Sequence, residues 1–177
     1  MEASDEQLMI AYRDGDPGAF ETLYARHKGR LFRFVLRALK ERAEAEELFQ
    51  QVWMRMIEAR GRYAPQARFT TWLYTIAHHR LVDHWRKKGL ALESLDDAAV
   101  ADPRPDPARQ AEGRESLARF VAALEALPPA QREAFVLREE AGLTLAEIAA
   151  ATASSEEAAK SRLRYAVAKL KAAVDDD

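Results

Sequence analysis

Residues 60–88 carry the most informative pattern in the sequence, RGRYAPQARFTTWLYTIAHHRLVDHWRKK. Seven of these residues are Lys or Arg, and Asp83 is the one acid among them. The stretch also contains five aromatic residues, Tyr63, Phe69, Trp72, Tyr74 and Trp85. Cations bind a phosphate backbone and flat rings stack on unpaired bases, so this combination is typical of a site for single-stranded nucleic acid.

The same stretch also has a structural interpretation, in which its apolar residues form core and its basic end is a solvated helix terminus. Helical spacing favours the functional interpretation. Arg80, His84 and Lys87 fall on one face at i, i+4 and i+7, whereas Leu81 and Trp85 point elsewhere. The basic face is therefore expected to be separate from the packed face.

Composition restricts the class of protein. The chain has 177 residues, no Cys and a formal charge of −2. The absence of Cys excludes disulfides, cysteine-ligated zinc and thiol nucleophiles. No apolar run approaches the roughly 20 residues of a membrane span, and the acidic N-terminus does not resemble a signal peptide. We therefore expect a cytoplasmic protein without membrane insertion.

Metal binding and catalysis find little support in the sequence. His79, Asp83 and Arg86 share a second face of the same predicted helix, where Asp83 is expected to pair with Arg86. His79 and Asp83 have ligand-like spacing, but no third ligand is well placed. The chain also has no nucleophile motif and no glycine-rich phosphate loop. We expect no metal, no cofactor and no enzymatic activity.

Charge divides the chain into parts. Residues 1–89 carry a net charge of +4, residues 90–113 carry −4 and residues 114–177 carry −2. Residues 90–112 repeat acid and proline with little apolar content, which predicts an extended, flexible linker. Because the whole chain is slightly acidic, only local patches can bind DNA, and binding to free DNA should be weak.

The first predicted domain, residues 1–89, has the periodicity of four helices. One covers about residues 5–14, and Asp16 followed by Pro17 is a start signal for the second. The third begins near residue 43 and ends by residue 61, and Trp53 within it is expected to be buried. Thr70 or Thr71 is expected to cap the fourth, which runs to about residue 88.

The second predicted domain, residues 113–177, is also helical. Capping boxes of Thr144 with Glu147 and of Ser154 with Glu157 predict a short helix and then a longer basic one. Two helices joined by a tight turn are typical of a helix-turn-helix, in which the second helix reads the major groove. The alternative is a surface helix with an ordinary polar face. The expected fold class is all-α, with two helical domains.

Three blocks resemble the extracytoplasmic-function (ECF) sigma factors, the promoter-specificity subunits of bacterial RNA polymerase. The first is residues 44–53 (EAEELFQQVW), similar to the family's polymerase-binding helix. The second is residues 69–77 (FTTWLYTIA) followed by Asp83 and Arg86. The third comprises residues 127–135 (LPPAQREAF), 142–149 (GLTLAEIA) and 160–163 (KSRL). The resemblance covers nearly the whole chain apart from the predicted linker.

The resemblance implies a role for each block. The residues implied to bind core polymerase, at the clamp helices of its largest subunit, are Glu47, Leu48, Gln50, Gln51 and Trp53. Those implied to hold the non-template strand at the −10 element are Arg60, Arg62, Tyr63, Phe69, Trp72, Tyr74, His79, Arg80, His84, Arg86 and Lys87. Those implied to lie at the −35 major groove are Lys160, Ser161, Arg162, Arg164 and Tyr165. The resemblance further implies a monomeric chain and an anti-sigma protein as partner.

The chain departs from the family pattern at several positions. His79 replaces the usual Asn, Gln51 replaces an acid, and Ala153-Ser154 replaces a Gly-Val turn. Tyr165 stands at a frequent Arg position. Two other functions remain as alternatives: a stand-alone helix-turn-helix regulator, and a helical interaction module without a DNA role.

Overall fold

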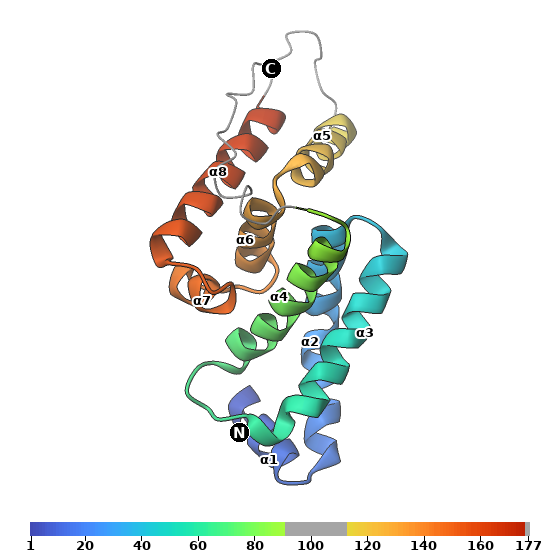
Figure 1. The fold of residues 1–177 in the computed structure, drawn as a ribbon, viewed down its shortest axis with the longest axis vertical. Helices are drawn as coiled ribbons and strands as arrows, with labels where there is room; N and C mark the ends of the chain where they lie inside the picture. Colours follow the sequence, from blue (N-terminus) through green and yellow to red (C-terminus); the bar gives the residue numbers. More distant parts are fainter. Residues whose placement is uncertain (91–112, 176–177) are drawn as a thin grey trace.

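The computed structural model describes residues 1–90 and 113–175, and their regular structure is entirely helical (Figure 1). The predicted all-α fold class is therefore confirmed. The predicted linker lies outside the described residues apart from Leu90. Among the described helices, none is long and apolar enough to cross a membrane.

The N-terminal half contains α1 (Asp5–Arg13), α2 (Pro17–Leu39), α3 (Arg42–Ala59), the short 3-10 helix η1 (Arg60–Arg62) and α4 (Phe69–Lys87). The predicted start of α2 is confirmed, since the Asp16 carboxylate accepts a hydrogen bond from the Gly18 amide at 3.0 Å and Pro17 is the first helical residue. Local side-chain chemistry therefore fixes where this helix begins.

The start of α4 differs from the prediction. Neither Thr70 nor Thr71 caps it: Arg68 occupies the N-cap position, and its side chain makes no capping hydrogen bond. Instead, the Glu6 carboxylate, on α1, accepts a hydrogen bond from the Phe69 amide at 3.0 Å. A residue more than sixty positions away in the sequence thus accepts a hydrogen bond from a free amide at this helix end. A local capping pattern cannot reveal such a distant partner.

The core of the N-terminal half forms where α2, α3 and α4 pack together. Its fully buried residues recur at helical spacing along each helix. They include Leu31, Phe34, Val52, Met56, Leu73 and Leu81. Burial of each such side chain stabilises the fold by about 1.5–3 kcal/mol. This packing holds α3 and α4 side by side and fixes which of their faces remain at the surface.

The C-terminal half contains α5 (Gly113–Ala126), α6 (Pro129–Glu139), α7 (Leu145–Ala151) and α8 (Glu156–Val174). The first predicted capping box is confirmed, with the Thr144 hydroxyl accepting from the Glu147 amide. The second is wrong by one residue. Ser155 caps α8 by accepting from the Ala158 amide at 3.0 Å. The hydroxyl of Ser154 is instead hydrogen-bonded to that of Thr152.

The turn between α7 and α8 explains that shift. The Ser154 amide donates to the carbonyl of Ala149 at 3.0 Å, which closes the helix end in a Schellman arrangement. That arrangement requires a left-handed residue, and Ala153 supplies it with φ of 52°. Glycine is the residue that usually fills this position, because a Cβ is strained there. The Ala153-Ser154 departure from the family pattern therefore keeps the turn but stores some strain in it.

The two halves are packed against each other. Helix α4 lies against α7, and α2 contacts α6 (Figure 1). Because α7 also packs on α8, one short helix links α4 to the basic last helix. Polar side chains make several of the contacts between the halves, among them Thr71 with Glu147 and His78 with Glu133.

Candidate nucleic-acid interface

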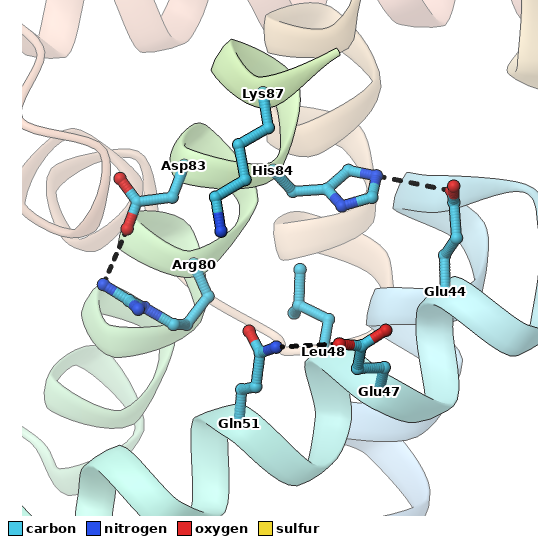
Figure 2. Close-up of a pocket in the computed structure, with 8 residues that line it drawn as sticks. All are labelled: Glu44, Glu47, Leu48, Gln51, Arg80, Asp83, His84 and Lys87. Atoms are coloured by element: carbon cyan, nitrogen blue, oxygen red, sulfur yellow. Dashed lines mark hydrogen bonds and ion pairs between the residues drawn. The ribbon is translucent and has the colours of Figure 1, made fainter.

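The basic face predicted on α4 borders a groove between α4 and α3. Arg80, His84 and Lys87 come from α4, and they line the groove together with Glu47 and Gln51 on α3 (Figure 2). The predicted common face of the three α4 residues is therefore confirmed. The groove also brings together residues that the sequence assigned to two different partners, DNA for α4 and polymerase for α3.

Ion pairs orient some of these side chains. The Arg80 guanidinium lies 2.7 Å from the Asp83 carboxylate, so the predicted pairing of Asp83 with Arg86 is wrong. Both arginines are three residues from Asp83, and periodicity alone cannot choose between them. Arg86 is exposed, and so is Lys87, whose side chain extends into the groove (Figure 2). Arg80 is thus partly neutralised, whereas Arg86 and Lys87 present their charges to solvent.

Glu44 connects the beginning of α3 with the end of α4. Its carboxylate lies 3.3 Å from His84 Nε2 and also pairs with the Lys88 ammonium. The hydrogen bond from Lys88 lowers the pKa of Glu44, against the opposing effect of burial. His84 therefore points toward an acid on the neighbouring helix, and this arrangement fixes one edge of the groove.

Three of the aromatic residues predicted to contact bases are buried. Tyr63, Phe69 and Tyr74 are 2%, 0% and 1% exposed. Tyr63 packs on Trp72 with ring centroids 5.0 Å apart, and Tyr74 packs on Phe34 at 5.2 Å. Burial raises the pKa of both tyrosines. In this structure these three rings are core residues that support the basic surface, and a base cannot stack on them.

Trp72 differs from those rings because it is only half-buried. The centroid of its ring lies 5.0 Å from that of Tyr63 and 6.1 Å from that of Phe69. Part of its ring therefore remains at the surface, close to the loop that precedes α4. Of the predicted stacking residues on α4, Trp72 is the one that this conformation leaves available to a base.

A second groove continues the basic surface toward the end of α3. It is lined by Arg62, His79 and Arg80, together with Arg55 and Glu58. Arg62 and His79 are exposed, as the prediction requires.

Arg60 is exposed as well, but its guanidinium donates to the Ile57 carbonyl at 2.7 Å and lies over the Tyr12 ring. These contacts direct Arg60 back toward the protein. Arg60 therefore contributes little to the basic surface, whereas Arg62 and His79 extend it from Arg80 and Lys87.

The predicted polymerase face of α3 separates into exposed and buried residues. Glu47, Gln50 and Gln51 are exposed, whereas Leu48 and Trp53 are 3% and 5% exposed and belong to the core. The burial expected for Trp53 from its residue type is confirmed, and contact of its ring with a partner is not possible in this conformation.

Two residues beside the predicted surfaces were missed by the sequence analysis. Met54 on α3 is 56% exposed and lines a groove with Gln50 and Gln51. Its position four residues after Gln50 and three residues after Gln51 was the signal that could have identified it. Arg55 was missed because it lies three residues before Glu58, a spacing that is typical of a surface ion pair. It does pair with Glu58, but it also lines the groove beside His79.

The residues predicted to lie at the −35 major groove are in the N-terminal part of α8. Lys160 and Arg164 are exposed, Tyr165 is 39% exposed, and Ser161 and Arg162 are half-buried. The Arg164 guanidinium lies over the Tyr165 ring at 5.3 Å, a cation–π contact that orients both side chains. Acidic residues in the first turn of α8 stabilise its N-terminus. Within residues 1–90 and 113–175, no group of three metal-ligating residues is found.

Comparison with known proteins points to the same two regions. Residues 23–90 match the family model Sigma-70 region 2, and residues 123–172 match Sigma-70, region 4. The chain belongs to the ECF sigma factors of the sigma-70 family. This sigma factor therefore acts in transcription initiation, where proteins of its family bind DNA and recognise promoters.

Curated relatives resemble this sigma factor along most of its length. It is 37% identical over 167 residues to RNA polymerase sigma factor CarQ of Myxococcus xanthus, covering 92% of this chain and 93% of CarQ. It is 33% identical over 166 residues to ECF RNA polymerase sigma factor SigK of Mycobacterium sp. (strain KMS), covering 92% and 85%.

Solved structures share its fold. CnrH, solved in complex with the cytosolic domain of CnrY, aligns with a TM-score of 0.73 at 26% identity over 99% of both chains. Sigma factor RpoE of Bartonella quintana, solved with anti-sigma factor NepR, aligns with a TM-score of 0.68 at 22% identity over 89% and 98%.

Proposed function

We propose that this sigma factor binds core RNA polymerase through the outer face of α3 and holds one DNA strand at the −10 element along α4. The groove in Figure 2 carries the proposal, because α3 residues Glu47 and Gln51 and α4 residues Arg80 and Lys87 line it together. A polymerase docked on α3 would lie beside a strand on α4. Binding to polymerase would then complete the site that separates the strands.

Strand separation requires no chemical step from the protein. Flipping a base out of a duplex costs a few kcal/mol, which stacking and phosphate contacts offset once the strand is held. Trp72 supplies the accessible ring, and Arg62, Lys87 and Arg86 supply exposed cations along the path. The chain as a whole has a net charge of −2, which opposes its binding to DNA. These few cationic contacts therefore do not hold DNA tightly without polymerase.

We further propose that α8 reads the −35 element through Lys160 and Arg164. Both side chains are exposed on the helix that follows the α7–α8 turn, as in other helix-turn-helix proteins. Arg and Lys reach the acceptor edges of guanine in the major groove. Arg164 is held by Tyr165, so this pair would replace the arginine that the family frequently carries at position 165.

A protein partner that blocks the sigma factor belongs to the same proposal. CnrH and the Bartonella RpoE were solved with CnrY and NepR, respectively, and NepR is described as an anti-sigma factor. We propose that an anti-sigma factor of comparable function holds this chain inactive. Pull-down of the tagged chain from its native bacterium, followed by mass spectrometry, tests this: recovery of polymerase subunits alone under all growth conditions would contradict it.

The polymerase contact is tested by the double substitution Glu47→Arg and Gln51→Arg. Both residues are exposed, so the variant should fold normally, and we expect it to lose co-elution with core polymerase in size-exclusion chromatography. The matched control is Glu21→Arg with Thr22→Arg on α2, two exposed residues outside the proposed face. Co-elution of the α3 variant at the wild-type level would refute the proposed docking face.

A further inference from the structure

The loop between η1 and α4 is held at both of its ends by side chains of α1. At one end, the Arg13 guanidinium donates to the Tyr63 carbonyl at 3.1 Å. At the other end, the Glu6 carboxylate accepts from the Phe69 amide at 3.0 Å. Residues 64–68 between these two points are exposed, so they have little packing of their own to fix their path. We call Glu6 and Arg13 the loop anchors.

Helix α1 gives the loop anchors a firm support. The two anchors are seven residues apart, which places them on the same side of the helix. The helix is attached to α2 at its first turn, where Asp5 accepts from Arg26 at 3.0 Å and lies 2.8 Å from His27 Nε2. Met9, in the middle of α1, is fully buried. The anchors therefore extend from a helix whose own position is fixed by packing and ion pairs.

The two anchored residues carry the rings that pack on Trp72. Ring centroids of Tyr63 and Phe69 lie 5.0 and 6.1 Å from that of Trp72. His27 of α2 packs on Phe69 in turn, at 5.2 Å. Arg62, an exposed cation of the proposed strand path, directly precedes Tyr63. A shift of either end of the loop would therefore displace groups that we assign to strand binding.

The side chain of Tyr63 is also close to the charges of α1. Burial and the charges of Glu6 and Asp5 raise the pKa of Tyr63, whereas the charge of Arg13 acts to lower it. Among the residues that the structure describes, the Tyr63 hydroxyl has no hydrogen-bond partner. No side-chain hydrogen bond of Tyr63 thus fixes this end of the loop, and the contact of Arg13 with the backbone becomes more important.

From these contacts we propose that Glu6 and Arg13 are positioning residues for the −10 strand, which hold the loop so that Trp72 and Arg62 are presented to DNA. The inference rests on the proposed function, because it concerns the same strand-binding surface. A loop that is fixed in advance loses less conformational entropy when the strand binds. Without an anchor, only a fraction of the molecules would have the loop in its binding form, and the apparent affinity would fall by that fraction.

The sign of the effect at Glu6 distinguishes positioning from simple electrostatics. Glu6→Ala removes a negative charge, so electrostatics alone predicts tighter binding of an anionic strand. Positioning predicts the opposite, about 10-fold weaker binding, because a hydrogen bond to a charged group is lost. Glu6→Gln removes the same charge but keeps an oxygen that can accept from the Phe69 amide. Its affinity for the strand should therefore remain close to that of the wild type.

The assay uses the complex of each variant with core polymerase. The probe is a fluorescent single-stranded oligonucleotide, taken from the −10 region of a start site mapped with this sigma factor. Binding is measured at a temperature at which circular dichroism shows each variant to be fully helical. Wild-type or tighter binding by Glu6→Ala would overturn the proposal, and so would equal weakening by Glu6→Ala and Glu6→Gln.

Arg13→Ala provides a second test, which leaves the hydrogen bond at the start of α4 intact. If Arg13 contacted a phosphate directly, its removal would reduce the slope of log K against log salt by about 0.7. A positioning residue lowers the affinity at every salt concentration without changing the slope, because the bound state keeps all of its phosphate contacts. A reduced slope, or wild-type affinity, would overturn the role assigned to Arg13.

Matched controls separate these effects from loss of charge and loss of structure. Glu21→Ala and Arg30→Ala remove the same charges from exposed positions on α2, and they should bind the strand as the wild type does. Both anchor variants should co-elute with core polymerase, and loss of co-elution would overturn the proposal by showing a general structural defect. If the wild-type complex itself does not bind the strand, the proposed function fails. If the wild type binds and the anchor variants match it, only the positioning role fails.

Discussion

Removal of exposed cations from α4 should reduce the salt dependence of strand binding by a calculable amount. The change is Arg86→Ala with Lys87→Ala, two exposed residues at the end of α4 that make no contribution to the core. Lys87, Arg80 and Arg62 line the two grooves, and Arg86 is exposed beside Lys87, so the proposed path carries four cations. Each phosphate contact with a single strand contributes about −0.7 to the slope of log K against log salt.

Four contacts thus predict a slope of about −3 from this surface, and two contacts predict about −1.4. Between 50 and 200 mM salt, the wild-type surface should lose roughly 50-fold in affinity and the variant only about 7-fold. Polymerase adds its own contacts to both slopes, so the difference between the two proteins is the quantity to compare. That difference should be about 1.4.

The assay measures binding of a fluorescent single-stranded oligonucleotide to the complex of sigma factor and core polymerase at a series of salt concentrations. The control is Lys28→Ala with Arg30→Ala, which removes the same charge from exposed positions on α2. The control slope should equal that of the wild type. Equal slopes for the α4 variant and the wild type, or equal reductions in both variants, would refute the assignment of the strand to α4.

Four further predictions concern the supporting structure. Phe69→Ala should lower the free energy of unfolding by about 3–5 kcal/mol, because the ring is fully buried. Ala153→Gly should raise it by about 0.5–1 kcal/mol by relieving the left-handed alanine. Ser155→Ala should lower it by about 1 kcal/mol through loss of the α8 cap. For Glu147, burial acts to raise the pKa, but hydrogen bonds from Thr144 and Thr71 and the charge of Arg68 outweigh it and lower the pKa. Its stabilising contribution is therefore complete above the unfolded pKa of about 4.3 and is lost as pH falls through the lower folded value.

Urea unfolding followed by circular dichroism measures the three substitutions, and the same measurement on the wild type and on Glu147→Gln across a series of pH values gives the pH dependence. A Phe69→Ala protein that is as stable as wild type but defective with DNA would show that the ring contacts a base. Destabilisation by Ala153→Gly would contradict the strain assigned to the turn. For Glu147, a stabilising contribution that decreases as pH rises from 4 to 7 would have the wrong sign.

Local signals in the sequence were enough to predict much of the fold. The Asp16–Pro17 start of α2 and the Thr144–Glu147 capping box involve residues within a few positions of each other, and the structure confirms both. The common face of Arg80, His84 and Lys87 was also predictable, because it follows from helical periodicity alone.

Features that depend on distant residues were not predictable. The cap of α4 comes from Glu6, and the pairing of Asp83 was ambiguous between two arginines at equal spacing. Tyr63 and Tyr74 lie among cations in the sequence, which suggested stacking on bases, yet their rings pack into the core between helices. An aromatic residue in a basic segment has the same sequence pattern whether it faces a base or another helix. Only packing distinguishes the two.

Transcription from genomic DNA fragments tests the central claim most directly. Purified chain is mixed with core polymerase from the same bacterium, and the 5′ ends of the RNA products are sequenced. We expect defined start sites that share sequence elements near −10 and −35, absent without the sigma factor and lost with Arg80→Glu and Lys87→Glu. Start sites identical with and without the chain would contradict its function as a promoter-specificity subunit. Full activity of the charge-reversed variant would contradict the strand-binding role of α4.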